Sequence, residues 1–323
     1  MSVSRRIFIT SALAGAAAVC QHAARAAFPE RPLRLIVPFP AGGAVDVVGR
    51  LLGNALSSAI GQPVVIDNRG GAGGIIGMEA SARAAPDGYT VMVSHSGFAA
   101  MPGLYRKLPF DPAKDFDGVV TAVSGSYVLA VHPSVPFRSV AELIAFAKAN
   151  PGKLTYASAG VGSTVHLGFE FFKRVVGVDI LHVPYRGAAP AITDLVGGQV
   201  HMLLGSTALI DPFAKSGNVR ALAVTSAKRS ALMPGLPTIA ETLPGFDVVG
   251  WYGLVVPAGT PRDVTARLNA KTLRVLKSAD LLEQFRQQGY EPVGNTPAEA
   301  SAYIRSEVAR WSQVIRDAGI EPQ

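Results

Sequence analysis

The stretch Leu33–Arg50, LRLIVPFPAGGAVDVVGR, joins an apolar strand to an amphipathic helix through the turn Pro40–Gly43. A helix that begins at such a turn leaves its first backbone N–H groups without intrahelical acceptors, and the positive end of the helix dipole lies at the same place. Both features favour a bound anion. Glycine also allows a ligand to approach the backbone closely. The stretch therefore predicts an anion-binding loop formed by Ala41, Gly42 and Gly43.

Asp46 falls in the first turn of this predicted helix and faces the same opening. Two roles stay open for its carboxylate. It accepts a hydrogen bond from a polar ligand, or it only neutralises the positive end of the helix.

A second loop of the same kind stands at Ala157–His166, ASAGVGSTVH, again between a predicted strand and a predicted helix. Gly160 and Gly162 give it an accessible backbone, and Ser163 or Thr164 is a natural N-cap. The hydroxyls either cap the helix alone or also meet a carboxylate. If the two loops face each other, each holds one end of a small acid.

Further candidate ligand contacts stand at the carboxyl ends of other predicted strands, where α/β folds bind ligands. For His95, a place in the cleft and a place on the surface both stay open. Arg186 either pairs with a ligand carboxylate or forms a structural ion pair. The full set of these additional candidates is Ser94, His95, Ser96, Arg186, Ala188 and Thr207.

Several common active sites have no motif in this sequence. The run Asn68–Gly77, NRGGAGGIIG, lacks the glycine spacing of a dinucleotide-binding fingerprint, and we expect a tight loop there. No G-x-S-x-G elbow occurs, and no two of the six histidines lie within a helical turn. Lys and Arg do not cluster into a nucleic-acid patch. We therefore expect no catalytic residue, no metal, no cofactor and no nucleic-acid partner.

Residues 1–26 are typical of an export signal of the twin-arginine type. Arg5 and Arg6 precede an apolar run that is too short to span a bilayer, and the small residues up to Ala26 suit a cleavage site. Cys20, the only cysteine, lies inside this segment, and Val19 before it makes a lipoprotein signal poor. We predict cleavage near Ala26 and a periplasmic mature chain without cysteine, with 27 basic and 23 acidic residues.

The rest of the chain alternates strand-like and helix-like segments, which predicts an α/β fold with mainly parallel sheets. We expect a two-lobed clamshell, with residues 27–122 and 250–323 in the first lobe and residues 123–249 in the second. The chain would cross between the lobes near Thr121–Ser126 and Asp247–Trp251. Strands are predicted at Leu33–Pro38, Val64–Asp67, Thr90–Ser94, Val119–Thr121, Val128–Val131, Leu154–Ala157, Ile180–Val183, Val200–Leu204, Ala221–Thr225 and Val249–Val256.

These segments together resemble the Bug family, the substrate-binding proteins of tripartite tricarboxylate transporters. The resemblance rests on an ordered series of blocks that covers nearly the whole mature chain. The blocks are VPFPAGGAVDVVGR, VVIDNRGGAGGIIG, PDGYT, LYRKLPFDPAKDF, LTYASAGVGSTVHL, HVPYRGAAPAITDLVGGQV, LAVT, LPTIAE and GLVVPAGTP.

The resemblance implies a type II periplasmic-binding-protein clamshell and a carboxylate, such as a di- or tricarboxylate, held largely by backbone N–H groups of the two loops. It extends ligand contact to Ala41, Gly42, Gly43, Asp46, Gly162, Ser163, Thr164, Arg186 and Ala188. It also implies integral-membrane transporter subunits as partners of a monomeric receptor. Two other functions stay open: a periplasmic sensor for a signalling partner, and an enzyme that acts on a carboxylate. The identity of the ligand is not legible in the sequence.

Overall fold

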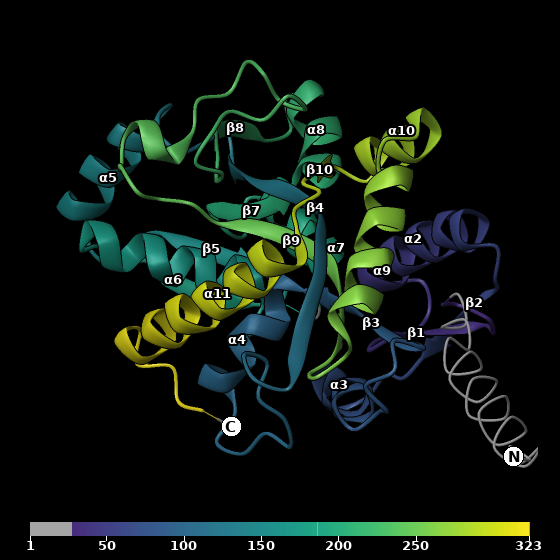
Figure 1. Ribbon diagram of the computed structural model, residues 1–323. Coiled ribbons are helices and arrows are strands. Elements are labelled where there is room, and N and C mark those ends of the chain that lie inside the picture. Colours follow the sequence, from purple (N-terminus) through teal and green to yellow (C-terminus); the bar gives the residue numbers. More distant parts are fainter. Residues whose placement is uncertain (1–27, 186, 323) are drawn as a thin grey trace, which may run out of the picture.

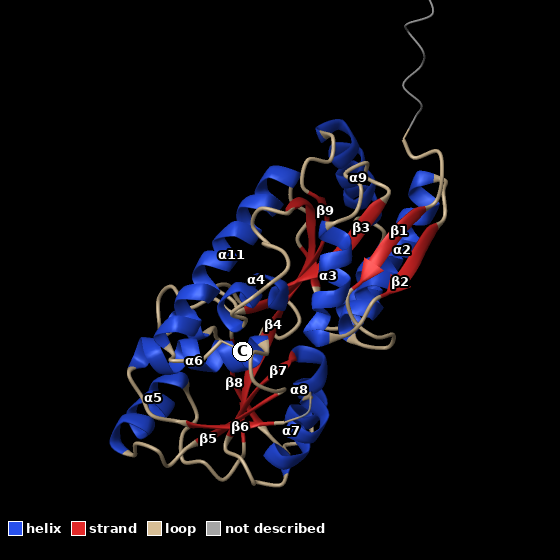
Figure 2. Ribbon diagram, turned by 90° about the horizontal axis from the view of Figure 1, so that it is seen from below, coloured by secondary structure: helices blue, strands red, loops and turns tan. Residues whose placement is uncertain are grey.

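The structure is a computed structural model that describes residues 28–185 and 187–322 (Figure 1). The predicted export signal and Arg186 lie outside the described residues. Figure 2 shows the described chain as two groups of strands and helices, with α11 lying along both. The two-lobe α/β fold expected from the sequence is thereby confirmed. The lobe limits near residues 122 and 250 stay a prediction.

The first lobe is built on three parallel strands in the order β2-β1-β3. Their alternation of apolar residues buries one face in a core that also contains Val48 and Leu52 of the following helix. Two helices from the C-terminal part of the chain, α9 and α10, contact α2 in this lobe. The bounds are β1 Leu33–Val37, β2 Val64–Asn68, β3 Thr90–His95, α2 Ala44–Ile60, η1 Ala72–Gly74, α3 Ile75–Ala82, α4 Ser96–Leu104, α9 Arg262–Val275 and α10 Ala279–Gln287.

The second lobe repeats the same arrangement with the parallel order β6-β5-β7. Its helices begin after these strands, as the helices of the first lobe do. The bounds are α5 Val140–Ala149, β5 Thr155–Ser158, α6 Thr164–Val176, β6 Leu181–Pro184, α7 Ala188–Val196, β7 Met202–Ser206, α8 Thr207–Lys215, β8 Arg220–Val224 and η2 Ile239–Glu241.

The long strand β4, Phe116–Val131, connects the two lobes. Up to Ser126 it pairs antiparallel with β9, Val249–Pro257, and from Tyr127 onward it pairs with β7 and β8. The prediction of two separate strands at Val119–Thr121 and Val128–Val131 was therefore wrong. The polar and glycine-containing residues between them stay in the strand because neighbouring strands satisfy their backbone groups on both sides.

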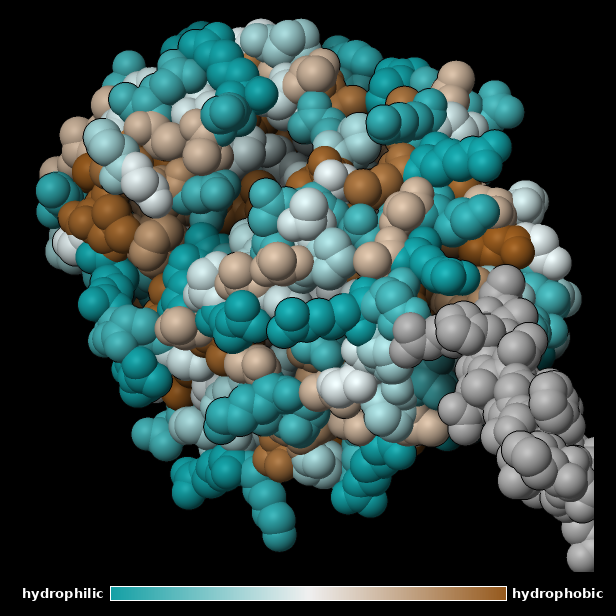
Figure 3. Space-filling view, in the orientation of Figure 1, coloured by the Kyte–Doolittle hydropathy of each residue, from teal (hydrophilic) through white to brown (hydrophobic). Residues whose placement is uncertain are grey.

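The C-terminal segment covers the junction between the lobes. The short strand β10, Glu291–Pro292, pairs with β4, and α11, Pro297–Asp317, contacts α4, β4 and α6. Figure 3 shows hydrophilic side chains along the face that carries α11, with hydrophobic side chains gathered towards the end where α5 lies. Helix α11 starts with a capping box, in which Thr296 and Glu299 accept hydrogen bonds from each other's backbone N–H groups.

One helix, α4, has little support in its local sequence. Helix α4, Ser96–Leu104, contains Gly97, Gly103 and Pro102, which are poor helix formers in isolation. Burial of Phe98 and Met101 in the core holds it in place. This helix matters for the site because its first turn lies at the end of β3.

Candidate functional site

A cavity of about 740 Å³ lies between the lobes, and five helices begin at its wall. Each of these helices follows a parallel strand: α2 follows β1, α4 follows β3, α6 follows β5, α7 follows β6 and α8 follows β7. The carboxyl ends of parallel strands are where α/β folds place their ligands, and each helix brings the positive end of its dipole there. The wall residues at these helix starts are Ala44, His95, Gly97, Ser163, Thr164, Val165, Ala188, Ser206 and Leu209.

The loop before α6 is held by neutral groups of its own. Gly160 and Gly162 have φ values of +122° and +80°. The Gly162 N–H donates to Nδ1 of His166 at 3.1 Å, and the Ser163 hydroxyl donates to the Gly160 carbonyl at 2.7 Å. Ser163 also caps the helix by accepting the backbone N–H of His166. The first N–H groups of α6, at Thr164 and Val165, have no intrahelical acceptors and lie at the cavity wall.

The side-chain atoms of Ser163 and His166 form no hydrogen bond with each other in the described chain. The serine hydroxyl faces Gly160 instead, and the imidazole nitrogen faces Gly162. The serine–imidazole pair that would have supported the enzyme alternative is therefore not formed by these two residues.

The loop before α2 is held by a charged group. The buried carboxylate of Asp46 accepts hydrogen bonds from the Gly42 N–H at 2.9 Å, from Arg50 Nε at 2.9 Å and from Asn68 Nδ2 at 2.8 Å. Burial opposes ionisation, but the bonds from Arg50, Gly42 and Asn68 outweigh it and lower the pKa of the Asp46 carboxyl. The Gly42 N–H, which the sequence predicted as a ligand contact, therefore already donates its hydrogen bond to Asp46.

Hydroxyl groups connect the lobes beside the cavity. Ser96 Oγ, at the start of α4, lies 3.0 Å from Thr164 Oγ1, at the start of α6. Burial raises the pKa of the phenol of Tyr127 in β4, while the hydroxyls of Thr164 and Ser96 oppose the shift. Leu104 of α4 packs against Gly162, since a Cβ atom placed there would lie 3.0 Å from Leu104 Cδ1. The two lobes are therefore in contact at this end of the cavity.

Three tyrosines form one wall of the cavity, which we call the tyrosine wall: Tyr127, Tyr252 and Tyr290. The rings of Tyr252 and Tyr290 meet edge to face at 5.1 Å, and their hydroxyl oxygens are 3.2 Å apart. Burial raises the pKa of both phenols, and the neighbouring tyrosines raise that of Tyr252 further. The tyrosine wall is uncharged across the ordinary pH range.

His95 also contributes a neutral ring to the cavity wall. It caps α4, because its Nδ1 accepts the Gly97 N–H at 3.1 Å, and it meets Phe39 edge to face at 5.1 Å. Burial lowers the pKa of His95 to about 4. Its Nε2 atom is buried and bonds no described residue.

The predicted site residues divide into three groups. Five of them lie at the cavity wall: His95, Gly162, Ser163, Thr164 and Ala188. Arg186 lies outside the described residues. The others are not among the wall residues, and their roles as ligand contacts stay predictions: Ala41, Gly42, Gly43, Asp46, Ser94, Ser96, Gly160 and Thr207.

Several wall residues were missed in the sequence analysis. Phe39, Ala44, Tyr105 and the tyrosine wall carried no motif, although Phe39 and Ala44 flank the first predicted loop. The alternation along β9 contained a signal, because neighbouring Trp251 faces the core and Tyr252 therefore faces the other way.

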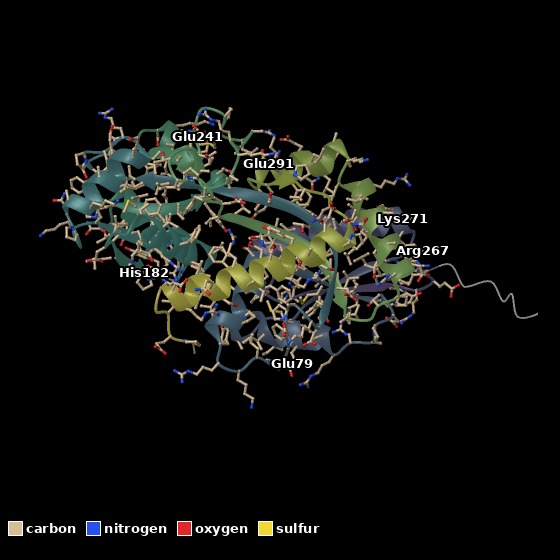
Figure 4. All side chains as sticks on the ribbon, turned by 60° about the vertical axis from the view of Figure 1, so that its left-hand side comes forward. Glu79, His182, Glu241, Arg267, Lys271 and Glu291 are labelled. Carbon is tan, nitrogen blue, oxygen red and sulfur yellow. The ribbon has the colours of Figure 1, made fainter. Side chains whose placement is uncertain are left out.

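A smaller cavity of about 320 Å³ lies away from this site, beside the start of the described chain. Its wall includes Phe28, Ile60, Arg267 and Lys271, and Figure 4 shows the last two on α9. Among residues 28–185 and 187–322, His, Cys, Asp and Glu form no group suited to a metal ion. In the same ranges, no helix combines the length and apolarity needed to cross a bilayer.

Comparisons with known proteins place this geometry in a family. The tripartite tricarboxylate transporter family receptor model matches residues 48–320. Protein BugT from Bordetella pertussis is 36% identical over 322 residues, covering 99% of each chain. A UPF0065 protein in the tcbD-tcbE intergenic region of Pseudomonas sp. (strain P51) is 40% identical over 313 residues, covering 96% of this chain and 93% of that protein.

Solved structures agree with the sequence relatives. Rpa4515 of R. palustris with adipate matches with a TM-score of 0.76 at 38% identity, over 92% of this chain and 100% of that one. The periplasmic binding protein BugD matches with a TM-score of 0.73 at 36% identity, over 92% of this chain and 100% of that one. MatC (Rpa3494) from Rhodopseudomonas palustris with bound malate matches with a TM-score of 0.72 at 33% identity, over 89% of this chain and 100% of that one. The chain therefore belongs to the tripartite tricarboxylate transporter family of solute-binding receptors, which includes the Bug proteins.

Proposed function

We propose that this chain is an extracytoplasmic receptor that binds a small carboxylate between its two lobes. The observation that carries the proposal is the meeting of five helix N-termini at one cavity. None of the described residues at its wall is Asp or Glu, so the dipoles face the ligand without an opposing charge at the wall. Adipate and malate in the solved relatives are anions of the kind that such a site favours.

The backbone N–H groups at the starts of α2 and α6 hold the carboxylate in this proposal, with the hydroxyls of Ser163 and Thr164 beside them. Because the ligand touches both lobes, it binds the closed arrangement more tightly and shifts the population towards it. Residues 1–26 direct export and are removed near Ala26. The mature receptor is a periplasmic monomer that delivers its ligand to integral-membrane transporter subunits.

Thermal unfolding of the mature chain with a panel of mono-, di- and tricarboxylates tests the proposal. A ligand at 100 times its Kd should stabilise the folded chain by about 2.7 kcal/mol. For a chain of this size we expect a rise in Tm of about 4 °C. Dimethyl adipate is the matched control for adipate, because it keeps the carbon chain and removes both charges. Equal stabilisation by acid and ester, or no stabilisation by any acid, contradicts carboxylate recognition.

A further inference from the structure

The cavity is large although the two lobes already touch at one end of it. Ser96 and Thr164 already join the lobes through a 3.0 Å contact between their hydroxyl oxygens, and Leu104 already packs on Gly162. The cavity still measures about 740 Å³. This value lies inside the range of about 300–1,000 Å³ found for pockets that enclose drug-sized molecules. A four-carbon diacid would leave much of it to water.

Apolar and aromatic side chains surround this space from both lobes. The first lobe supplies Phe39, Met101, Leu104 and Tyr105, and the second lobe supplies Val161, Leu203, Leu204 and Leu209. Such a wall favours a ligand with an apolar body, because burial of apolar surface drives binding. Rings gain further from edge-to-face contacts, such as the one that Phe39 already makes with His95.

The tyrosine wall offers hydroxyl groups and no charge. The phenols of Tyr127, Tyr252 and Tyr290 stay protonated, so each hydroxyl both donates and accepts a hydrogen bond. A neutral polar group on a ligand finds partners there. The helix starts suit the carboxylate better, because the positive ends of the helix dipoles face it there.

Two glycines make room for side chains of the tyrosine wall. A Cβ atom at Gly125 would lie 2.8 Å from Tyr290 Cδ1, and one at Gly250 would lie 2.7 Å from the Tyr127 hydroxyl oxygen. Both glycines are at the cavity wall. A larger residue at either position would displace the neighbouring tyrosine or the backbone beside it. The tyrosine wall and its glycines therefore form one continuous part of the site.

From these contacts we infer that the ligand is a ring-bearing monocarboxylate whose ring carries a hydroxyl or similar neutral polar group. The carboxylate lies at the helix starts, the ring lies among the apolar side chains, and the neutral group bonds the tyrosine wall. This inference rests on the proposed function and specifies its ligand.

Isothermal titration of the mature chain with benzoate, the three hydroxybenzoate isomers, adipate and malate tests the ligand class. We expect the tightest hydroxybenzoate to bind at least tenfold more tightly than adipate or malate. If adipate or malate binds as tightly as every aromatic acid, the inference is overturned while carboxylate recognition stands. If no acid binds, the proposed function fails with it.

A substitution in the tyrosine wall separates hydrogen bonding from packing. In the variant Tyr290→Phe the Kd of the preferred hydroxybenzoate should rise about tenfold, while the Kd of benzoate should change less than twofold. Tyr303→Phe is the control, because Tyr303 packs on Trp251 and is not among the cavity-wall residues. If Tyr290 acts only through its structural contact with Tyr252, the substitution should raise the Kd of both ligands by the same factor. That result contradicts the assigned role.

Discussion

The loop before α2 and the loop before α6 follow the same plan, but different groups hold them. In the first, the Gly42 N–H is bonded by the buried carboxylate of Asp46, which Arg50 neutralises. In the second, the Gly162 N–H is bonded by the neutral imidazole of His166. An anionic ligand that approaches the first loop therefore meets the negative charge of Asp46 behind the backbone. At the second loop, the neutral ring of His166 carries no such charge. The comparison indicates that the α6 loop contributes more to the binding of a carboxylate.

The matched variants Gly162→Val and Gly43→Val should differ most. Gly162 has a φ of +80°, and an added Cβ would lie 3.0 Å from Leu104, whereas the nearest atom to a Cβ at Gly43 is 3.9 Å away. Forcing valine into the left-handed region costs about 1–3 kcal/mol and displaces the loop. We expect the Kd of the tightest acid in the panel to rise about 10- to 100-fold for Gly162→Val and at most about threefold for Gly43→Val.

Isothermal titration measures both affinities, and circular dichroism melting checks that both variants fold. Equal weakening by the two substitutions would remove the distinction between the loops. A stronger effect at Gly43 would reverse it.

The pH dependence of the α6 loop gives an intermediate effect. Burial and the stacked ring of His182 lower the pKa of His166 to about 4, while Glu170 opposes and Lys173 supports the shift. The unfolded chain then takes up a proton before the folded chain does as the pH falls. The stability from neutral His166 is therefore complete above about pH 6.5 and is lost progressively towards pH 4. At pH 5 the loss is on the order of 1–2 kcal/mol.

The variant His166→Asn tests this, because its amide oxygen still accepts a bond from Gly162 and does not titrate. The fall in Tm between pH 7 and pH 5 should be smaller in the variant than in the unaltered chain, and its Kd at pH 5 should be less weakened. Parallel pH profiles of the two proteins would mean that another group controls the loop.

The smallest effect is expected at the α2 loop from Asp46→Asn. The amide keeps an acceptor for Gly42 but removes the ion pair with Arg50, whose side chain is 47% exposed and partly solvated. We expect a loss of stability of about 1 kcal/mol, or about 2 °C in Tm, and less than a threefold change in Kd. Since the pKa of Asp46 is lowered in the folded chain, its contribution persists at neutral pH and disappears as the pH falls through the folded pKa. A tenfold or larger loss of affinity would show that Asp46 itself meets the ligand.

Local signals were sufficient for most of the fold. Helices α5 and α6 follow local signals, because a serine N-cap precedes each apolar run and, for α6, Gly177 ends it in the left-handed region. The failures occurred where tertiary packing overrides local preference. Helix α4 contains Pro102, and β4 contains Gly125, yet both elements are continuous because the core and the neighbouring strands hold them.

The candidate site was predictable only in part. Loops that join a strand to a helix can be recognised in a sequence. Five residues predicted on this basis lie at the cavity wall: His95, Gly162, Ser163, Thr164 and Ala188. The tyrosine wall could not be predicted from the sequence, because its residues come from β4, β9 and the turn after α10. They meet only in the folded chain.

The sequence by itself determined the alternation of strands and helices, the glycines that shape the two loops and the family blocks, since each depends on neighbouring residues. The tertiary structure decided which backbone N–H groups are already bonded and what faces the ligand. Asp46 reaches Asn68, Ser96 reaches Thr164 and Tyr252 reaches Tyr290 across 22, 68 and 38 residues of chain. Contacts of that separation depend on how the whole chain packs, and no local pattern encodes them.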